Sequence, residues 1–159
     1  MKIENTLKEM GVSLPVFGDK TYYGATYGKM KPYHLVGNVL HLSGHVPVVD
    51  GEVVHPGRLG ATLSVDQGYE AARITGINVL AGFKQALGDL DRIIAIVKSL
   101  NFVVCEPDFY DVHKVSSGLT DLLADAFGDE IGIGCRATIG VQSLARNNCF
   151  ETWISAQVR

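Results

Sequence analysis

The pattern of apolar and polar residues divides the chain into a succession of predicted strands and helices. Residues 38–48 are rich in Val and Leu and predict a strand, and the Asp-Gly pair in residues 48–54 predicts a turn between two short strands. Ser64 with Gln67 three residues later is a capping box that begins a helix, and Gly88 is suited to end it. The apolar residues between them recur at three- and four-residue steps: Tyr69, Ala72, Gly76, Leu80, Phe83 and Leu87.

The second half of the chain predicts one more helix and three more strands. Residues 92–105 are too rich in β-branched residues for a helix and predict a strand in the centre of the sheet. Residues 131–144 and 149–158 are joined by a turn at "ARNN" and predict an antiparallel hairpin. Between these strands Asp108 is expected to cap a helix that ends at Gly128. The apolar positions of this helix are Phe109, Val112, Leu119, Leu122 and Ala126.

This order of elements predicts an α+β two-layer sandwich, in which a mixed β-sheet has two helices packed on one face. Residues 1–159 are expected to form a single domain, with residues 1–30 as an irregular N-terminal arm rich in Gly, Pro and Tyr. The face of the sheet that the helices do not cover also carries apolar side chains. We therefore expect another copy of the chain to cover that face, which makes the protein a homo-oligomer.

Arg136 is a single charge within a run that otherwise predicts a buried strand. By strand parity it shares one face with Gly134, Thr138 and Gly140, which are small or polar and leave room beside the guanidinium. The opposite face is apolar and is assigned to the core: Ile133, Cys135, Ala137, Ile139 and Val141. This pattern indicates a surface where a ligand contacts the arginine.

Glu151 is the only acid on the last predicted strand. Trp153 follows it on the same strand face, whereas Phe150 belongs to the apolar face, so Glu151 and Arg136 are expected to share the less apolar side of one sheet. Two interpretations remain open. The two side chains form a structural ion pair, or the guanidinium is free to bind a carboxylate at two points while the acid orients a water.

Composition and charge exclude several classes of protein. The 159 residues are 47% hydrophobic and carry a formal net charge of -3, with Lys and Arg spread along the chain. A nucleic-acid partner is not expected, because such proteins need a basic stripe. No apolar run approaches the ~20 residues that span a bilayer, and the N-terminus does not resemble a signal peptide, so we expect a cytoplasmic protein. The odd set of cysteines indicates reduced core thiols: Cys105, Cys135 and Cys149.

The histidines and glycines give no support for a metal or a cofactor. His41 and His45 are four residues apart, which is about 13 Å along a strand and too far for one ion. His113 is expected at the boundary of the second helix, packed beside Val112. Neither a phosphate-binding loop with its lysine nor a dinucleotide fingerprint is present, so no cofactor is expected.

The motifs and their order resemble the RidA family, also called the YjgF/YER057c/UK114 family. The resemblance covers about residues 37–158. The family pattern has a Ser-Gly-Gln-x-Pro strand end, a Pro-Ala-Arg-Ser strand and a Val-Glu-Ile last strand, and this chain has SGHVP at 43–47, GCRA at 134–137 and FET at 150–152. The helical stretch "SSGLTDLLADAFG" is most similar to a longer-helix subgroup of mostly uncharacterised members.

The resemblance implies a chorismate-mutase-like fold and a homotrimer with sites in the clefts between subunits. It also implies the hydrolysis of reactive 2-imino acids to 2-oxo acids and ammonia without metal or cofactor. Arg136 would hold the substrate carboxylate and Glu151 would position the attacking water. Backbone groups at Gly44 and Thr138 would fix the substrate and that water, and His113 stands where the family has a substrate-binding asparagine.

The chain departs from the family pattern at four positions. His45 replaces a glutamine, His113 an asparagine and Ala137 a serine, and Met30 stands where active relatives have a tyrosine, with tyrosines three residues to either side. Two functions therefore remain open. The protein is either an enamine/imine deaminase or a catalytically inactive trimer that binds a small carboxylate, such as a 2-oxo acid.

Overall fold

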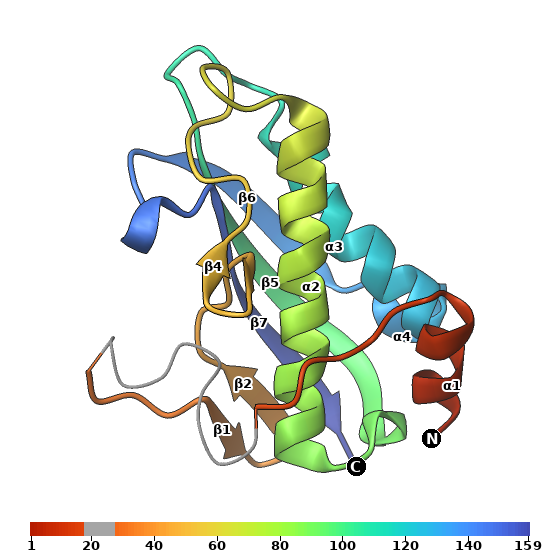
Figure 1. The fold of residues 1–159 in the computed structure, drawn as a ribbon. Helices are drawn as coiled ribbons and strands as arrows, with labels where there is room; N and C mark the ends of the chain where they lie inside the picture. The colour runs from red at the N-terminus through yellow and green to blue at the C-terminus, as the bar shows by residue number, and fades with distance from the viewer. Residues whose placement is uncertain (18–27) are drawn as a thin grey trace.

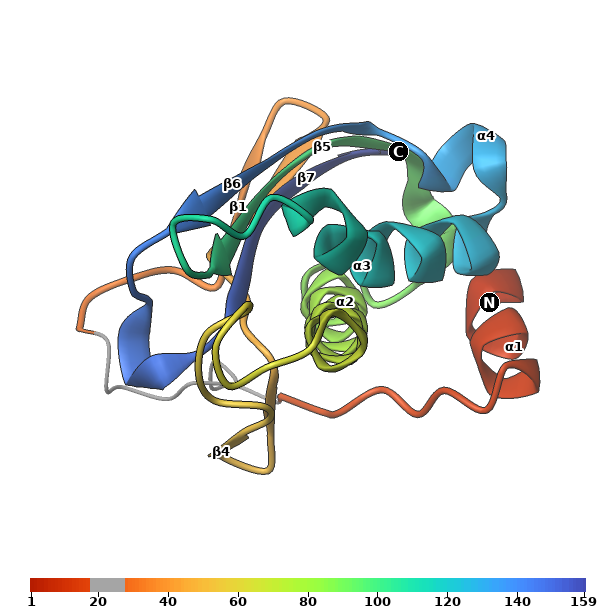
Figure 2. The same ribbon diagram turned by 90° about the horizontal axis from the view of Figure 1, so that it is seen from above.

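A five-stranded sheet and two long helices form the two layers of the protein (Figures 1 and 2). The computed structural model describes residues 1–17 and 28–159. The strand order is β1-β2-β7-β5-β6, in which β5 and β6 are parallel and the other neighbouring pairs are antiparallel. Both α2 and α3 lie on the same face of the sheet, as Figure 2 shows. The predicted α+β sandwich with a mixed sheet and two helices on one face is confirmed.

The helices and strands follow one another along the chain with these bounds: α1 (Lys2–Glu9), β1 (Tyr33–Val36), β2 (Val39–Leu42), β3 (Val48–Val49), β4 (Glu52–Val53), α2 (Val65–Leu87), β5 (Ile93–Val104), α3 (Val112–Phe127), α4 (Asp129–Gly132), β6 (Cys135–Val141) and β7 (Phe150–Val158). Short 3₁₀ turns at Leu90–Arg92 and Ala145–Asn147 precede β5 and β7. No helix of the described residues is both long and apolar enough to cross a bilayer.

The first long helix, α2, begins and ends where the sequence predicts. The Ser64 hydroxyl accepts a hydrogen bond from the Gln67 backbone N–H (3.2 Å), and the Gln67 side chain accepts one from the Ser64 backbone N–H (2.9 Å). This capping box satisfies two N–H groups that lack partners inside the helix. At the other end Gly88 has a φ of +75°, which a glycine adopts without steric cost.

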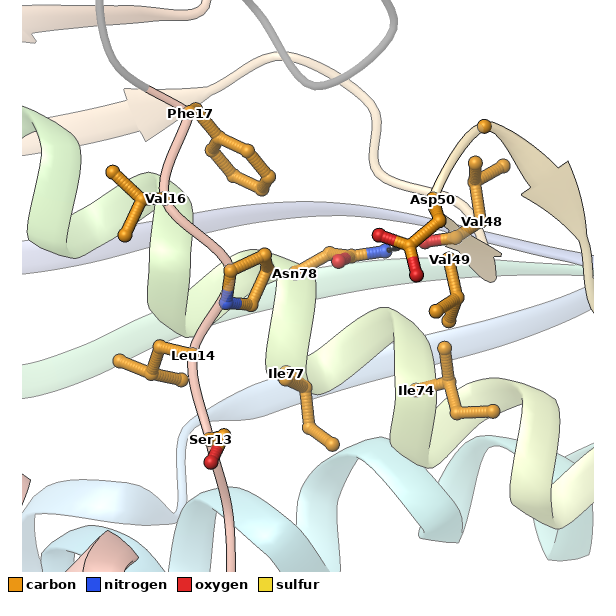
Figure 3. A pocket seen from close by; sticks show the side chains of 12 residues that line it. Ser13, Leu14, Val16, Phe17, Val48, Val49, Asp50, Ile74, Ile77 and Asn78 are labelled. Carbon is orange, nitrogen blue, oxygen red and sulfur yellow. Dashed lines mark hydrogen bonds between the residues drawn. The ribbon is translucent and has the colours of Figure 1, made fainter.

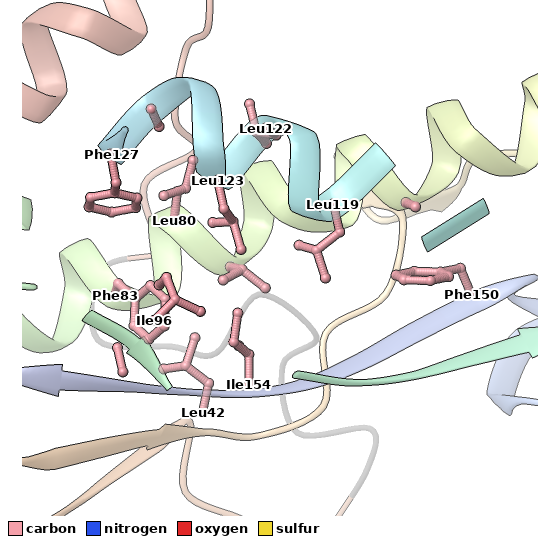
Figure 4. Close-up of a cluster of buried hydrophobic side chains, with 14 of the residues drawn as sticks. Leu42, Leu80, Phe83, Ile96, Leu119, Leu122, Leu123, Phe127, Phe150 and Ile154 are labelled. Atoms are coloured by element: carbon pink, nitrogen blue, oxygen red, sulfur yellow. The ribbon is translucent and has the colours of Figure 1, made fainter. Parts of the chain in front are cut away.

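The two long helices are held close together at Gly118 of α3. A methyl group at this position would lie 2.0 Å from the backbone oxygen of Tyr69 in α2 and 3.1 Å from the backbone nitrogen of Arg73, so only glycine fits. Figure 4 shows the apolar side chains that fill the space between the helices and the sheet. They include Leu80, Phe83, Ile96, Leu119, Leu122 and Ile154.

The N-terminal segment differs from the predicted irregular arm. Residues Lys2–Glu9 form a helix, α1, whose residues Ile3 and Leu7 are buried in the core. The helix begins against Asp91, whose carboxylate accepts the backbone N–H groups of Lys2 (2.7 Å) and Ile3 (2.9 Å). Sequence analysis missed this helix because its cap comes from 88 residues or more along the chain. Residues 13–17 lie in an irregular stretch, and the part of the predicted arm at 18–27 lies outside the described residues.

The strands near the N-terminus are shorter and more numerous than predicted. The strand expected at 38–48 ends at Leu42, and an additional strand, Tyr33–Val36, pairs with it. The Asp-Gly turn is confirmed between β3 and β4, with positive φ values at Asp50 and Gly51. The second long helix has Asp111 as its N-terminal flanking residue rather than the predicted Asp108.

The last two strands do not form the predicted hairpin. β5 is an interior strand, but the middle strand of the five is β7 rather than the predicted β5; β5 lies between β6 and β7, pairing in parallel with β6 and antiparallel with β7. The faces of β6 are also reversed relative to the prediction. Ile139 is 45% exposed and Cys135 is exposed as well, because this apolar side lies on the helix-free face of the sheet; Ile133, which is 59% exposed, precedes the strand.

Candidate functional site

Arg136 points toward helix α3 from the edge strand β6. Its partner in β5 is Ser99, which is buried on the helix-covered face. The guanidinium Nη1 donates hydrogen bonds to the hydroxyl groups of Thr120 (3.0 Å) and Ser117 (3.4 Å) in α3. Among the described residues it has no carboxylate partner, and the residue is exposed. The charge is therefore held by neutral hydroxyl groups and remains available to an anion.

Thr138 and the first turn of α3 continue this polar cluster. The Thr138 hydroxyl donates to Ser116 (2.8 Å), and the hydroxyls of Ser116 and Ser117 both donate to the backbone oxygen of His113 (3.1 and 3.0 Å). The residue His113 is exposed rather than packed at the helix boundary as predicted. We call these residues the β6–α3 cluster: His113, Ser116, Ser117, Thr120, Arg136 and Thr138.

Glu151 lies in a second cluster on the helix-free face of the sheet. The indole N–H of Trp153 donates to Glu151 Oε2 (2.7 Å), and a methyl group on Gly44 would lie 2.8 Å from the same oxygen. Burial raises the pKa of the Glu151 carboxyl above its ordinary value, and the hydrogen bond from Trp153 acts in the opposite direction. We call Gly44, Glu151 and Trp153 the open-face cluster.

The two clusters face opposite sides of the sheet, which corrects the expectation that Arg136 and Glu151 share one side. In the sheet register Arg136 of β6 is level with Ser99 of β5 and Ile154 of β7, and both of these residues are buried beneath the helices. Glu151 is level with Phe102 of β5 and is three residues from Ile154 along β7. Three residues along a strand reverse the side-chain direction. β5 also separates the two strands. Within one chain the two side chains therefore form neither an ion pair nor a shared site.

The positions that depart from the family pattern are distributed over both faces. His45 is buried, its Nδ1 donates to the Ser43 backbone oxygen (2.6 Å), and burial lowers the pKa of its imidazole to about 4. It is therefore neutral near pH 7. Ala137 is exposed on the helix-free face, and Met30 is 43% exposed. Of the nearby tyrosines, Tyr33 is exposed and Tyr27 lies outside the described residues.

Comparison with known families identifies the chain. Residues 8–150 match the family model described as "YjgF/chorismate_mutase-like, putative endoribonuclease". The chain belongs to the YjgF/RidA family. The match includes the β6–α3 cluster and Gly44, and it ends one residue before Glu151.

Three relatives that align with most of this YjgF/RidA chain are described without a common activity. "Protein TCP17" of Trypanosoma cruzi is 34% identical over 90% of this chain and 86% of its own length. A solved structure of the protein Atu1372 from Agrobacterium tumefaciens, a protein described as having unknown function, is 32% identical with a TM-score of 0.88, covering 99% of this chain and 93% of its own. A "putative endoribonuclease" from Shewanella oneidensis is 29% identical with a TM-score of 0.89, covering 98% and 99%.

Two large pockets of this RidA-family protein lie away from the predicted site residues. One of about 660 Å³ lies between residues 13–17, helix α2 and the β3–β4 turn, where Val49, Asp50 and Asn78 line it (Figure 3). Another of about 830 Å³ lies beside Arg58 at the ends of β5 and β6. Neither is lined by Arg136 or Glu151.

One cluster of three carboxylates among the described residues has structural partners. Glu4, Asp89 and Asp91 bring ligand atoms within 4.8 Å of one another. Asp91 accepts backbone N–H groups of α1, and Glu4 pairs with the Lys84 ammonium (2.6 Å) and accepts the Leu90 N–H (3.2 Å). These acids join α1 to the turn before β5.

Sequence reasoning missed four polar or aromatic members of the two clusters. Ser116, Ser117 and Thr120 occur in "SSGLTDLL", where hydroxyl residues interrupt the apolar face of a helix next to the predicted His113. This interruption is a signal that could have been used. Trp153 was assigned to the face of Glu151, but its hydrogen bond depends on a rotamer that strand parity does not predict.

Proposed function

We propose that the protein hydrolyses small 2-imino acids to 2-oxo acids and ammonia in clefts between the subunits of a homotrimer. The observation that carries this proposal is the state of Arg136, an exposed residue whose guanidinium, in the part of the chain that the structure describes, is held only by the hydroxyls of Thr120 and Ser117. An arginine in this state can bind a carboxylate at two points, and that is the group that every 2-imino acid carries.

The chemistry requires one general base and one water. With the carboxylate bound by Arg136, Glu151 takes a proton from water as the oxygen bonds to the iminium carbon, and the electron pair of the C=N bond moves to nitrogen. The protonated Glu151 then donates to that nitrogen. The C–N bond breaks as C=O forms, and the hydroxyl proton leaves with the nitrogen as ammonium. An iminium carbon is already electrophilic, so orientation and a held water can supply the acceleration.

The opposed directions of Arg136 and Glu151 require two copies of the chain in this mechanism. The β6–α3 cluster lies along an edge strand, and the open-face cluster lies on a sheet face with exposed apolar side chains, including Ile139 and Trp153. Stacking the edge of one copy against the open face of another would cover those side chains and bring the two clusters together. A closed ring of such contacts repeats the same cleft at every interface.

The activity is tested by generating 2-iminopropanoate with an amino-acid oxidase in the presence of semicarbazide. We expect the protein to slow the formation of the semicarbazone, because the imine is hydrolysed before it is captured. An unchanged capture rate, under conditions where an active relative slows it, would rule out the deaminase. Binding of 2-oxobutanoate without such turnover would then support the carboxylate-binding trimer instead.

Mixed oligomers provide a test of the cleft between subunits. Arg136→Ala and Glu151→Gln are each expected to be inactive, whereas a mixture that has exchanged subunits should regain about a quarter of the wild-type activity. In such a mixture one cleft in four combines an intact arginine from one copy with an intact glutamate from its neighbour. Native mass spectrometry would verify the exchange, and mixed trimers without recovered activity would contradict the proposed cleft.

Purified protein is expected to leave RNA intact. The chain has 14 Lys and Arg against 17 Asp and Glu, a balance that disfavours binding to a phosphate backbone. Gel electrophoresis of RNA after incubation with the wild type and with Arg136→Ala would check this. Cleavage by the wild type that the Arg136→Ala variant loses would contradict the expectation, whereas contaminating nuclease would act equally in both samples.

A further inference from the structure

Trp153 lies next to the carboxylate of Glu151 on the open face of β7. The two residues are two positions apart, so both side chains leave the strand on the same side. The indole N–H donates to Glu151 Oε2 at 2.7 Å. The ring of Trp153 also contacts Phe102 of β5, with ring centroids 4.8 Å apart and an interplanar angle of 56°. The hydrogen bond and the ring contact together fix the orientation of the indole.

The backbone at Gly44 packs against the same carboxylate oxygen. A methyl group there would lie 2.8 Å from Oε2, 3.1 Å from Cδ of Glu151 and 3.2 Å from Nε1 of Trp153. Oε2 is therefore in close contact with both the indole N–H and the Gly44 backbone. Oε1 makes no hydrogen bond with any residue in the described ranges 1–17 and 28–159.

We infer that Trp153 is a positioning residue. Its indole N–H occupies Oε2 of Glu151 through a hydrogen bond, so Oε1 is the oxygen of this carboxylate that accepts the proton of the water in the cleft. This inference rests on the proposed function, in which Glu151 activates the water. A carboxylate with two free oxygens can rotate and present either of them. Anchoring one oxygen limits the carboxylate to one orientation, which reduces the entropy lost when the water and substrate are aligned.

Among residues 1–17 and 28–159, no charged side chain provides the same support for the Glu151 carboxylate. On this face of the sheet the nearest titratable groups of the adjoining strands are His41 of β2, Lys98 of β5 and Cys135 of β6. All three are level with Ser155 of β7 in the sheet register. Ser155 is four residues from Glu151, about 13 Å along the strand. The indole N–H is thus the group that favours the ionised carboxylate, against the burial that raises its pKa.

The chain has a single tryptophan, so the indole N–H signal in ¹H–¹⁵N NMR spectra reports on Trp153 alone. We expect the chemical shift of this signal to change with pH in the wild type and not in Glu151→Gln. The Glu151→Gln variant also identifies the carboxyl signal of Glu151 in ¹³C spectra of labelled protein, because that signal is missing from its spectrum. Trp153→Phe keeps an aromatic ring at this position but removes the indole N–H donor, so the pKa of the Glu151 carboxyl should rise. Tyr69→Phe is the matched control, since it removes another donor to a carboxylate, Asp121, at the same 2.7 Å.

The pH profile of turnover provides the second readout. Because Glu151 must be ionised to accept a proton, Trp153→Phe should move the acid limb of kcat/KM to higher pH, with kcat/KM about tenfold lower at the wild-type midpoint. Tyr69→Phe should keep the wild-type profile. An unchanged Glu151 pKa in Trp153→Phe, or an indole signal that titrates equally in Glu151→Gln, would overturn the inference. If the wild type has no deaminase activity, the proposed function fails, and the NMR titrations still decide whether Trp153 controls the carboxylate.

Discussion

Glu151→Gln is expected to lower kcat/KM for a 2-imino acid by about a thousandfold while 2-oxobutanoate still binds. The amide has nearly the same shape as the carboxylate and can accept the hydrogen bond from Trp153, but it cannot take a proton from water. Because Arg136 faces the opposite side of the sheet in the same chain, the substitution leaves the guanidinium and its hydroxyl partners intact. Steady-state kinetics and calorimetric titration with 2-oxobutanoate would measure the two effects separately.

Arg136→Ala should give the contrasting result, in which turnover and binding are lost together. Removing a guanidinium that binds a carboxylate at two points is expected to weaken 2-oxobutanoate binding by about a hundredfold. Arg146→Ala is a matched control, because Arg146 is also exposed and, within residues 1–17 and 28–159, donates only to the Gly51 backbone oxygen (2.7 Å). If Arg136→Ala bound the acid as tightly as Arg146→Ala does, Arg136 would have no role in binding.

Gly118→Ala is expected to produce the largest loss of stability among single methyl additions in the helices, about 3 kcal/mol or more. The added carbon would lie 2.0 Å from the Tyr69 backbone oxygen and 2.9 Å from its carbonyl carbon. Backbone atoms of a capped helix cannot move away as a side chain can, so α3 would have to separate from α2. The same displacement would move Ser117 and Thr120, which hold Arg136.

Urea denaturation of Gly118→Ala and Gly76→Ala would measure this effect. Gly76 is the appropriate control because the close contacts of its added methyl group would be with the ends of side chains, Leu122 Cδ2 at 2.8 Å and Leu119 Cδ1 at 3.1 Å, while the nearest backbone atom, Leu119 Cα, would lie at an ordinary 3.7 Å. These side chains can repack, and alanine favours the helix, so the loss should stay below about 1 kcal/mol. Equal midpoints for the two variants would show that the helices separate without cost.

Local sequence signals predicted the elements whose stabilising contacts lie within a few residues. The capping box at Ser64 and Gln67 defines the start of α2, and the turn at Asp50 and Gly51 joins two adjacent strands. Both depend on hydrogen bonds or dihedral angles within the segment itself. Helix α1 was missed for the opposite reason, since its first N–H groups are capped by Asp91, far along the chain.

The candidate site was predicted by residue type and not by arrangement. Arg136 and Glu151 are each unusual charges in apolar strands, and parity assigned Thr138 to the side of the former and Trp153 to that of the latter. Parity alone does not identify the face that the helices cover. The apolar side of β6, which contains Ile139, is therefore assigned to the core by its pattern and is instead exposed in the structure.

The sequence by itself determined the class of fold, the long strand β5, helix α2 and the residue types of the site, because periodicity and capping are encoded locally. Only the tertiary structure decided that β5 separates β6 from β7, and that Arg136 and Glu151 point to opposite faces. Strand order depends on contacts between segments distant in sequence, here β5 with strands that begin more than 30 residues later. A pattern within one strand contains no information about which neighbour it will pair with or which face the helices will cover.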